Sequence, residues 1–240
     1  MSEPHFLFPT SKPLVSGSFG DYDSLSAATP KSLALECDIA EIRLDLFQHE
    51  FSQQGPNLWA HLIGFPLLFT ARCHAEGSPV NLSSLVRKSL LNAALPSASL
   101  IDIEAASIEE MRDLVDEMNT KHIPWIASFH NFERLPSLQE LTSLATYSKE
   151  AGASAFKFAA RLHLVDELPI LANLQAHDFG LPTASMGMGN LAPVSRLLCA
   201  QNGSVLNYGF IGKSETAPGQ WPAKLLREGI RASCSFLKRP

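Results

Sequence analysis

The feature that most constrains the fold is a regular alternation between short apolar runs and helix-like stretches over 240 residues. Eight of the runs have the length and composition of buried strands. Strands that alternate with helices form a parallel sheet with crossover helices, and eight strands are the number that closes a barrel. The expected strands are Leu14–Ser18, Ile39–Phe47, Pro66–Cys73, Ser99–Ala105, Pro124–Phe132, Ala155–Arg161, Leu181–Met188 and Ser204–Ile211.

No linker, charge block or low-complexity segment divides the chain, and its length suits one α/β barrel. We therefore predict an α/β protein with the (β/α)8 TIM-barrel fold, in which residues 1–240 form a single catalytic domain. An open, doubly wound sheet is the structural alternative, because it uses the same alternation of strands and helices.

Several helix ends carry recognisable signals. A helix over Asn81–Leu95 begins with an asparagine that can cap it, and helices over Ser107–Lys121 and from Ser137 begin with capping-box sequences. Gly152 and Gly203 stand where helix C-caps are expected. The remaining expected helices are Leu164–Ala176, Ala192–Ala200 and Trp221–Phe236.

Composition excludes several classes of function. The net charge is −5 with no basic stripe, so we expect no nucleic-acid partner. The four cysteines are scattered without a CxxC pair, and the histidines show no metal-ligand spacing, so we expect neither a disulfide framework nor a metal site. A reducing, cytoplasmic location fits this cysteine usage. The N-terminus has no signal-peptide pattern, and the apolar run Leu62–Ala71 is too short to span a bilayer, so we expect no membrane contact.

Lys157 is the most informative single residue. In a strand, Phe156 and Phe158 face one side and Lys157 faces the other. A buried lysine is costly unless it is used, and burial lowers its pKa so that its amine can form a Schiff base with a carbonyl. The alternative for this residue alone is a lysine that reaches solvent from a strand end.

Other expected strands also end in polar side chains, which is where barrel enzymes place their chemistry. Asp102 and Glu104 share one face of the fourth strand, and they could simply form ion pairs inside the barrel. The further candidates are Glu41, Arg43 and Asp45 on the second strand, Arg72 and Glu76 after the third, His130 on the fifth, Arg196 after the seventh, and the loop from Thr216 to Gln220 after the eighth.

These residue types together define a chemistry. Lys157 is a candidate imine former. His130 is a candidate proton carrier, because the unperturbed pKa of histidine lies near neutrality, and Glu76 is a carboxylate that can orient the imidazole. The arginines suit an anionic substrate, because a guanidinium binds a carboxylate through two hydrogen bonds; they are Arg43, Arg72 and Arg196. The spacing therefore indicates a cofactor-free Schiff-base lyase or aldolase acting on a small oxo-carboxylate.

An ordered set of motifs covers nearly the whole chain. The motifs are Glu41-x-Arg43-x-Asp45, Thr70-x-Arg72-x3-Glu76-Gly77, Ser128-x-His130-x-Phe132, Lys157, Ser185-Met186-Gly187, Ser195-Arg196 and Ala217-Pro218-Gly219-Gln220. In order and spacing this set resembles the type I 3-dehydroquinate dehydratase family. The resemblance implies a (β/α)8 barrel and a hydro-lyase that catalyses the third step of the shikimate pathway. This step serves the biosynthesis of chorismate and aromatic amino acids, and the same reaction also serves the breakdown of quinate. It also implies a cytoplasmic homodimer that uses no metal or organic cofactor.

The resemblance also implies a role for each candidate residue. Lys157 would form the imine with the ring ketone of 3-dehydroquinate, His130 would move the proton, and Glu76 would hold His130. The product would be 3-dehydroshikimate plus water. The residues expected to bind substrate are Glu41, Arg43, Arg72, Arg196, Thr216 and Gln220.

The chain departs from the family pattern at Ser78, Asn131 and Thr216, where glycine, aspartate and serine are common. Three alternatives to the dehydratase remain. One is a class I aldolase, and another is a sensor that binds dehydroquinate or quinate without reacting. The third is a phosphate site at Gly187 and Gly189, although two glycines are a weak signal.

Overall fold

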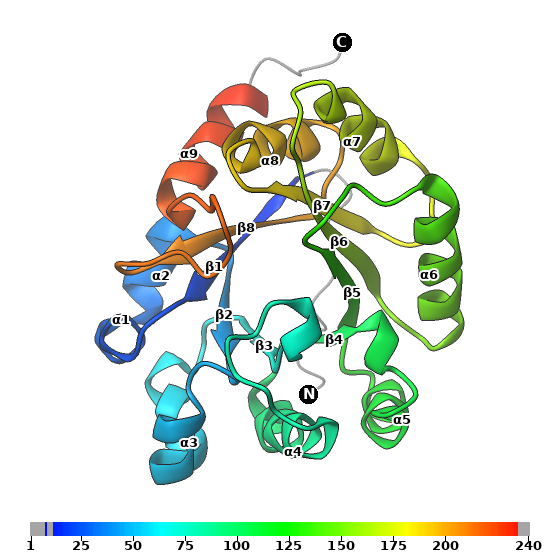
Figure 1. Cartoon of the computed structure of the whole chain (residues 1–240). Coiled ribbons are helices and arrows are strands. Elements are labelled where there is room, and N and C mark those ends of the chain that lie inside the picture. The colour runs from blue at the N-terminus through cyan, green and yellow to red at the C-terminus, as the bar shows by residue number, and fades with distance from the viewer. Residues whose placement is uncertain (1–7, 9–11, 235–240) are drawn as a thin grey trace.

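The computed structural model describes Phe8 and residues 12–234 and has a barrel of parallel strands ringed by helices (Figure 1). The strands are β1 Leu14–Phe19, β2 Ile39–Arg43, β3 Leu67–Thr70, β4 Leu100–Glu104, β5 Trp125–Asn131, β6 Ala155–Arg161, β7 Thr183–Met188 and β8 Leu206–Ile211. They pair in the order β7-β6-β5-β4-β3-β2-β1-β8, and every pair is parallel. The predicted α/β barrel fold is therefore confirmed.

The barrel is nearly closed. Within the described residues no ladder joins β7 to β8, and the N–H of Val205 donates to the carbonyl of Thr183 at 3.0 Å where the two strands begin. We call this gap the β7–β8 seam. It matters for the site, because a side chain from outside the barrel reaches the interior there.

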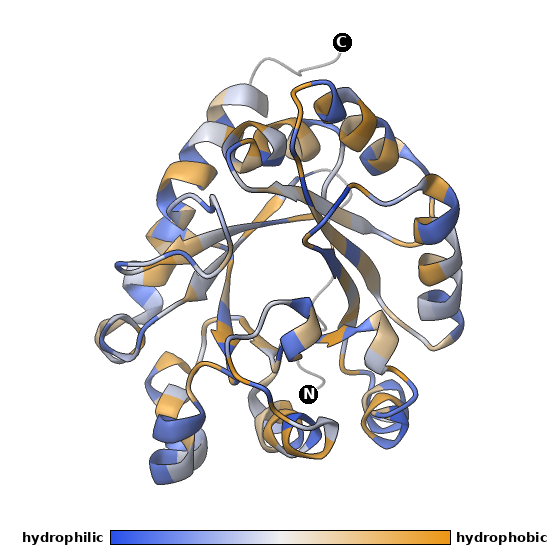
Figure 2. Ribbon diagram, viewed as in Figure 1, coloured by the Kyte–Doolittle hydropathy of each residue, from blue (hydrophilic) through white to orange (hydrophobic). Residues whose placement is uncertain are grey.

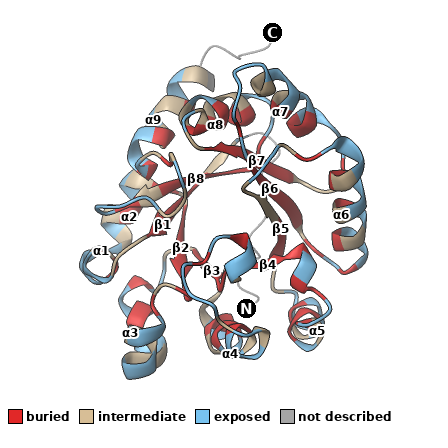
Figure 3. Ribbon diagram, in the orientation of Figure 1, coloured by how far each residue is buried: buried red, intermediate tan, exposed pale blue. Residues whose placement is uncertain are grey.

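Helices cover the outside of the barrel. They are α1 Tyr22–Ala27, α2 Pro30–Glu36, α3 Gln48–Gln54, α4 Ser84–Ala94, α5 Arg112–Lys121, α6 Leu138–Glu150, α7 Glu167–Ala176, α8 Ala192–Gln201 and α9 Ala223–Cys234. Short 3-10 turns are η1 Gly55–Leu62, η2 His74–Glu76, η3 Leu95–Ser97 and η4 Ala105–Ser107. Hydrophobic and hydrophilic residues alternate around the helix axes, and the helices are exposed mainly on the side away from the strands (Figures 2 and 3).

Apolar residues form two separate cores. The outer core fills the space between strands and helices and includes Phe156 and Phe158. The inner core lies inside the barrel, where the first inward residues of the strands include Ile39, Leu100 and Ile126. Side chains alternate between the two faces of a strand, so the next inward positions face the same interior, one step nearer the carboxyl ends. Those positions are Glu41, Thr70, Asp102, Ser128 and Lys157, and all are buried.

Several predicted element boundaries were wrong. Helix α4 is capped by the hydroxyl of Ser83 rather than by Asn81, and the predicted helix from Ser107 begins only at Arg112. The hydroxyl of Ser107 instead accepts a hydrogen bond from Arg87, which explains why it caps no helix. Strand β2 ends at Arg43, because the chain turns there.

Other helix predictions are confirmed. Ser137 and Glu140 form the predicted capping box of α6. Gly152 and Gly203 follow helices with positive φ angles of 96° and 92°. Helix α9 begins at Ala223, and Phe236, where we expected it to end, lies outside the described residues. Among the helices of the described chain, none is long and apolar enough to cross a membrane.

Candidate active site

A cavity of about 570 Å³ opens at the carboxyl ends of the strands. It is lined by side chains from the strands, from the turns that follow them and from the loop after β8. All nine residues that the sequence predicted for the site lie around it: Glu41, Arg43, Arg72, Glu76, His130, Lys157, Arg196, Thr216 and Gln220. Met186, Met188 and Phe132 add apolar surface to the wall.

Lys157 points into this cavity from β6. Phe156 and Phe158 pack outward in the outer core, as their alternation predicts, and Lys157 is only 3% exposed. Its Nζ donates to Asp102 Oδ2 at 2.9 Å and lies 4.1 Å from the centre of the Tyr208 ring. Burial lowers the pKa of the Lys157 amine, and the charge of Asp102 only partly opposes this. The buried position therefore favours the neutral, nucleophilic amine.

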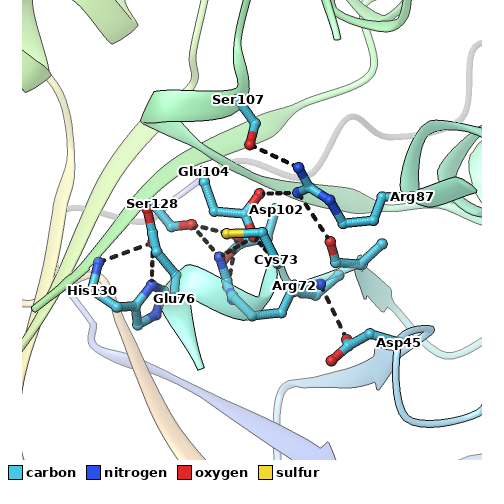
Figure 4. A network of polar contacts seen from close by, with 12 residues as sticks. Asp45, Arg72, Cys73, Glu76, Arg87, Asp102, Glu104, Ser107, Ser128 and His130 are labelled. Carbon is cyan, nitrogen blue, oxygen red and sulfur yellow. Dashed lines mark hydrogen bonds and ion pairs between the residues drawn. The ribbon is translucent and has the colours of Figure 1, made fainter. Parts of the chain in front are cut away.

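Asp102 is the partner that couples Lys157 to Arg72. Its Oδ1 accepts from Arg72 Nη2 at 2.9 Å and from the hydroxyl of Ser128 at 2.6 Å. Although burial alone would raise the pKa of Asp102, the positive charges of Arg72 and Lys157 hold it below its ordinary value. Asp102 is thus a carboxylate shared by two cations, Arg72 and Lys157. Figure 4 shows Asp102 beside the first of these, Arg72.

The ion-pair interpretation of Asp102 and Glu104 is confirmed. Glu104 accepts from Arg72 Nη1 at 3.1 Å and from Arg87 Nη1 at 2.7 Å. Both carboxylates are buried on one face of β4, so each needs such partners to offset the loss of water.

His130 and Glu76 form a buried pair on the other side of Arg72. Glu76 Oε2 lies 2.8 Å from His130 Nδ1 and also accepts from the backbone N–H of His130 at 3.0 Å. When Glu76 is ionised, its Oε2 can only accept, so Nδ1 is then the donor and the opposite ring nitrogen, Nε2, carries the lone pair.

Burial sets the protonation of the pair. It lowers the pKa of His130 well below its ordinary value, and the charges of Arg72 and Lys157 act in the same direction. Burial also raises the pKa of Glu76 to about 8. The imidazole is therefore neutral at neutral pH and can accept a proton.

Glu76 comes from the short turn η2, which ends at Gly77. Gly77 has a φ of 102°, and a Cβ there would lie 2.6 Å from the Phe132 ring. Only glycine combines that backbone conformation with so close an approach. The turn therefore brings Glu76 under His130 because residue 77 has no side chain.

Arg196 reaches the cavity through the β7–β8 seam. It lies on α8, outside the barrel, and is 1% exposed. Its Nη1 donates to the carbonyl of Tyr208 on β8 at 2.8 Å and lies 3.3 Å from the sulfur of Met186 on β7. The guanidinium thus bonds to the strand edge where the ladder is missing.

Arg196 has an unusual electrostatic position. Among the described residues no carboxylate forms an ion pair with it, and its buried Nε has no hydrogen-bond partner. Burial lowers its pKa to about 10, so the group remains charged at neutral pH. A buried cation without a counter-ion in an open cavity is suited to bind an anion.

Glu41, Arg43 and Asp45 are all held in place. Glu41 accepts hydrogen bonds from the hydroxyls of Ser18 and Thr70. Arg43 pairs bidentately with Asp45, through Nε at 2.9 Å and Nη2 at 2.7 Å. Asp45, which we expected on the strand, lies in the turn beyond it and is buried while Arg43 lines the cavity.

The loop after β8 covers part of the cavity. Gln220 Oε1 accepts from the backbone N–H of Thr216 at 3.0 Å and from its hydroxyl at 2.8 Å. The carbonyl of Pro218 accepts from the N–H of Gly189, which ties the loop to the end of β7. Thr216, Pro218 and Gln220 line the cavity from this side.

The three departures from the family pattern each have a local partner. Ser78 is buried and its hydroxyl accepts from the N–H of Val80 at 3.2 Å, and the side chain of Asn131 accepts from the N–H groups of Glu133 and Arg134. Thr216 keeps the hydroxyl that bonds to Gln220. The substitutions are therefore accommodated without breaking the site.

The glycines at the end of β7 were considered as an alternative phosphate site. The phosphate interpretation of Gly187 and Gly189 was wrong, because the N–H of Gly187 donates to Ser195 Oγ and that of Gly189 to Pro218. No cluster of three or more histidine, cysteine or acidic residues that could hold a metal occurs in the part of the chain that the structure describes.

Of the two contacts of Lys157, the one with Asp102 was predicted only in part and the one with Tyr208 was not predicted. Asp102 was recognised only as a possible ion-pair partner, although its placement on the inward face was the available signal. Tyr208, whose ring faces the lysine, was not considered; its position two residues after the inward Leu206 could have indicated it.

A parallel barrel with a buried lysine, a histidine–carboxylate pair and an unpaired arginine at the carboxyl ends of its strands has the organisation of a barrel enzyme. The chain belongs to the type I 3-dehydroquinase family, whose family model matches residues 15–235. Family membership places it among the hydro-lyases.

Relatives agree over most of the chain. A 3-dehydroquinate dehydratase of Methanocella arvoryzae is 31% identical over 84% of this chain and 90% of its own length. That of Methanothermobacter thermautotrophicus is 33% identical over 80% of this chain and 84% of its own length. A crystal structure of 3-dehydroquinate dehydratase from Geobacillus kaustophilus has a TM-score of 0.81 and 23% identity, covering 95% of this chain and 93% of that one. The last comparison supports the fold.

Proposed function

We propose that the protein is a type I 3-dehydroquinate dehydratase, which removes water from 3-dehydroquinate through a Schiff base on Lys157. The observation that carries the proposal is that the buried amine of Lys157 faces the same cavity as the His130–Glu76 pair and Arg196. The product is 3-dehydroshikimate, an intermediate of the shikimate pathway. The names of the curated relatives support this substrate.

The reaction begins with imine formation. Burial lowers the pKa of Lys157, so a larger fraction of its amine is neutral and can attack the ring ketone. The carbonyl oxygen leaves as water, and the nitrogen becomes an iminium. Asp102, at 2.9 Å from Nζ, stabilises this positive charge, and the ring of Tyr208 presents its face to the same nitrogen.

Elimination follows from the iminium. His130 Nε2 takes the proton from the neighbouring carbon, and the electron pair moves to the iminium nitrogen to give an enamine. The electrons then return, and the hydroxyl leaves as water with the proton from His130. Hydrolysis of the remaining imine restores the Lys157 amine and releases the product.

Substrate groups find matching partners around the cavity. We assign the substrate carboxylate to Arg196, which has no carboxylate partner of its own among the described residues. The amide N–H groups of Gln220 suit an adjacent hydroxyl, because its Oε1 is already bonded to Thr216. Glu41, Arg43 and Arg72 line the opposite wall and suit the ring hydroxyls.

The activity can be tested by following the ultraviolet absorbance of the conjugated enone product as 3-dehydroquinate is consumed. We expect turnover by the wild-type protein and a loss of at least about 1000-fold in Lys157→Ala, since the covalent route is then closed. Binding of substrate without turnover by the wild-type protein would contradict the proposal and indicate a sensor.

We also propose that the enzyme acts in the cytoplasm as a homodimer on this small molecule, without nucleic acid or membrane. The buried, unpaired thiols of Cys37 and Cys199 fit a reducing compartment. Sedimentation velocity tests the assembly, and a stable monomer at micromolar concentration would contradict the homodimer.

A further inference from the structure

Arg87 is a buried cation outside the cavity. It lies on α4, on the outer side of the barrel, and its side chain is 4% exposed. Its Nη1 donates to Glu104 Oε2 at 2.7 Å, and its Nη2 donates to Ser107 Oγ at 3.1 Å (Figure 4). Neither the ordered motifs nor the proposed reaction steps assign this residue a role.

Glu104 connects Arg87 to two parts of the site. Its Oε1 accepts from Arg72 Nη1 at 3.1 Å and from the backbone N–H of Cys73 at 2.8 Å. The first contact leads through Arg72 and Asp102 to the amine of Lys157. The second fixes the residue that begins the turn η2, which carries Glu76.

Arg72 divides its guanidinium between two carboxylates. Nη2 bonds to Asp102 and Nη1 to Glu104, whose other oxygen is occupied by Arg87. Without Arg87, Glu104 Oε2 would lack an ionic partner in a buried place, and a bidentate pair with Arg72 would satisfy it. That pairing would draw Arg72 away from Asp102 and so disturb the carboxylate that holds Lys157.

We propose that Arg87 is a positioning residue that acts through Glu104. By occupying Glu104 Oε2 it keeps Arg72 shared between Glu104 and Asp102, and it keeps the Cys73 N–H on Glu104 Oε1. Arg87 thereby holds both Lys157 and the Glu76–His130 pair in position. This inference rests on the proposed dehydratase function.

The test compares Arg87→Gln, Arg87→Lys, Glu104→Gln and the double variant Arg87→Gln/Glu104→Gln in the dehydration assay. We expect Arg87→Gln to lower kcat by roughly 10-fold to 100-fold with little change in KM, as displacement of catalytic groups does. Arg87→Lys should recover most of the loss. Lys88→Gln is the matched control, because Lys88 is the next residue on α4 and its ion pair within the described part of the chain is with the exposed Asp113.

The double variant separates positioning from packing. If Arg87 acts through Glu104, the double variant should be no slower than Glu104→Gln, since the two effects are then not additive. Additive losses, or wild-type kcat in a folded Arg87→Gln, would overturn the inference. Circular dichroism shows whether Arg87→Gln folds. If it does not fold, the inference is tested by comparing the double variant with Glu104→Gln and by the kcat of Arg87→Lys. Absence of turnover in the wild-type protein would instead contradict the proposed function and the inference together.

Discussion

At the scale of the residue, the site is organised by what surrounds Lys157. Burial lowers its pKa, yet Asp102 and the Tyr208 ring reduce the free-energy cost of burying its charged form. The same nitrogen can therefore be a neutral nucleophile first and a cationic iminium later. Strand alternation was enough to predict that Lys157 faces inward, because the phenylalanines on either side need the outer core.

The histidine gives a prediction for pH dependence. His130 must begin each turnover neutral, and burial together with Arg72 and Lys157 lowers its pKa well below 6.5. A base with a lowered pKa keeps its lone pair to lower pH, so kcat should stay flat as the pH falls past 6.5. The measurement is the pH profile of kcat, which reports the pKa values of groups in the enzyme–substrate complex. The profile of kcat/KM is less direct, because it also depends on the ionisation of Lys157 in the free enzyme. An acidic limb centred at or above pH 6.5 in kcat would contradict a general base with a lowered pKa at His130.

At the scale of the element, local signals predicted helices better than they predicted where helices begin. Ser137 caps α6 as expected, because its capping box involves only neighbours in the sequence. Ser107 shows the same local pattern, but its hydroxyl is used by Arg87 from another helix. A contact between residues 20 positions apart leaves no trace in a local pattern.

The loop after β8 gives a prediction at this scale. Thr216 closes the loop by donating its hydroxyl to Gln220 Oε1 at 2.8 Å. Thr216→Val keeps the shape but removes this bond, and we expect kcat/KM to fall about fivefold, as for a neutral hydrogen bond of about 1 kcal/mol. Thr216→Ser keeps the hydroxyl and should stay near the wild-type value in the same steady-state assay. Loss in Thr216→Ser with wild-type activity in Thr216→Val would mean that the threonine methyl, not the hydroxyl, matters.

At the scale of the whole molecule, the alternation of strands and helices was enough to predict the barrel. Most residues of the site could be predicted for the same reason. Once eight parallel strands are assumed, their carboxyl ends must meet, and polar residues found there are brought together. Arg196 was expected in the site from its motif, but the route by which its side chain reaches the cavity could not be predicted. It enters through the β7–β8 seam, and sequence gives no sign of where a barrel leaves a pair of strands unbonded.

The most direct test of the account is to trap the covalent intermediate. The protein is incubated with 3-dehydroquinate and borohydride, its intact mass is measured, and the modified peptide is identified, with Lys157→Ala as the control. We expect one adduct per chain on Lys157, with the mass of the dehydrated product after reduction, and none in the control. An adduct on another lysine, or turnover without any adduct, would contradict it.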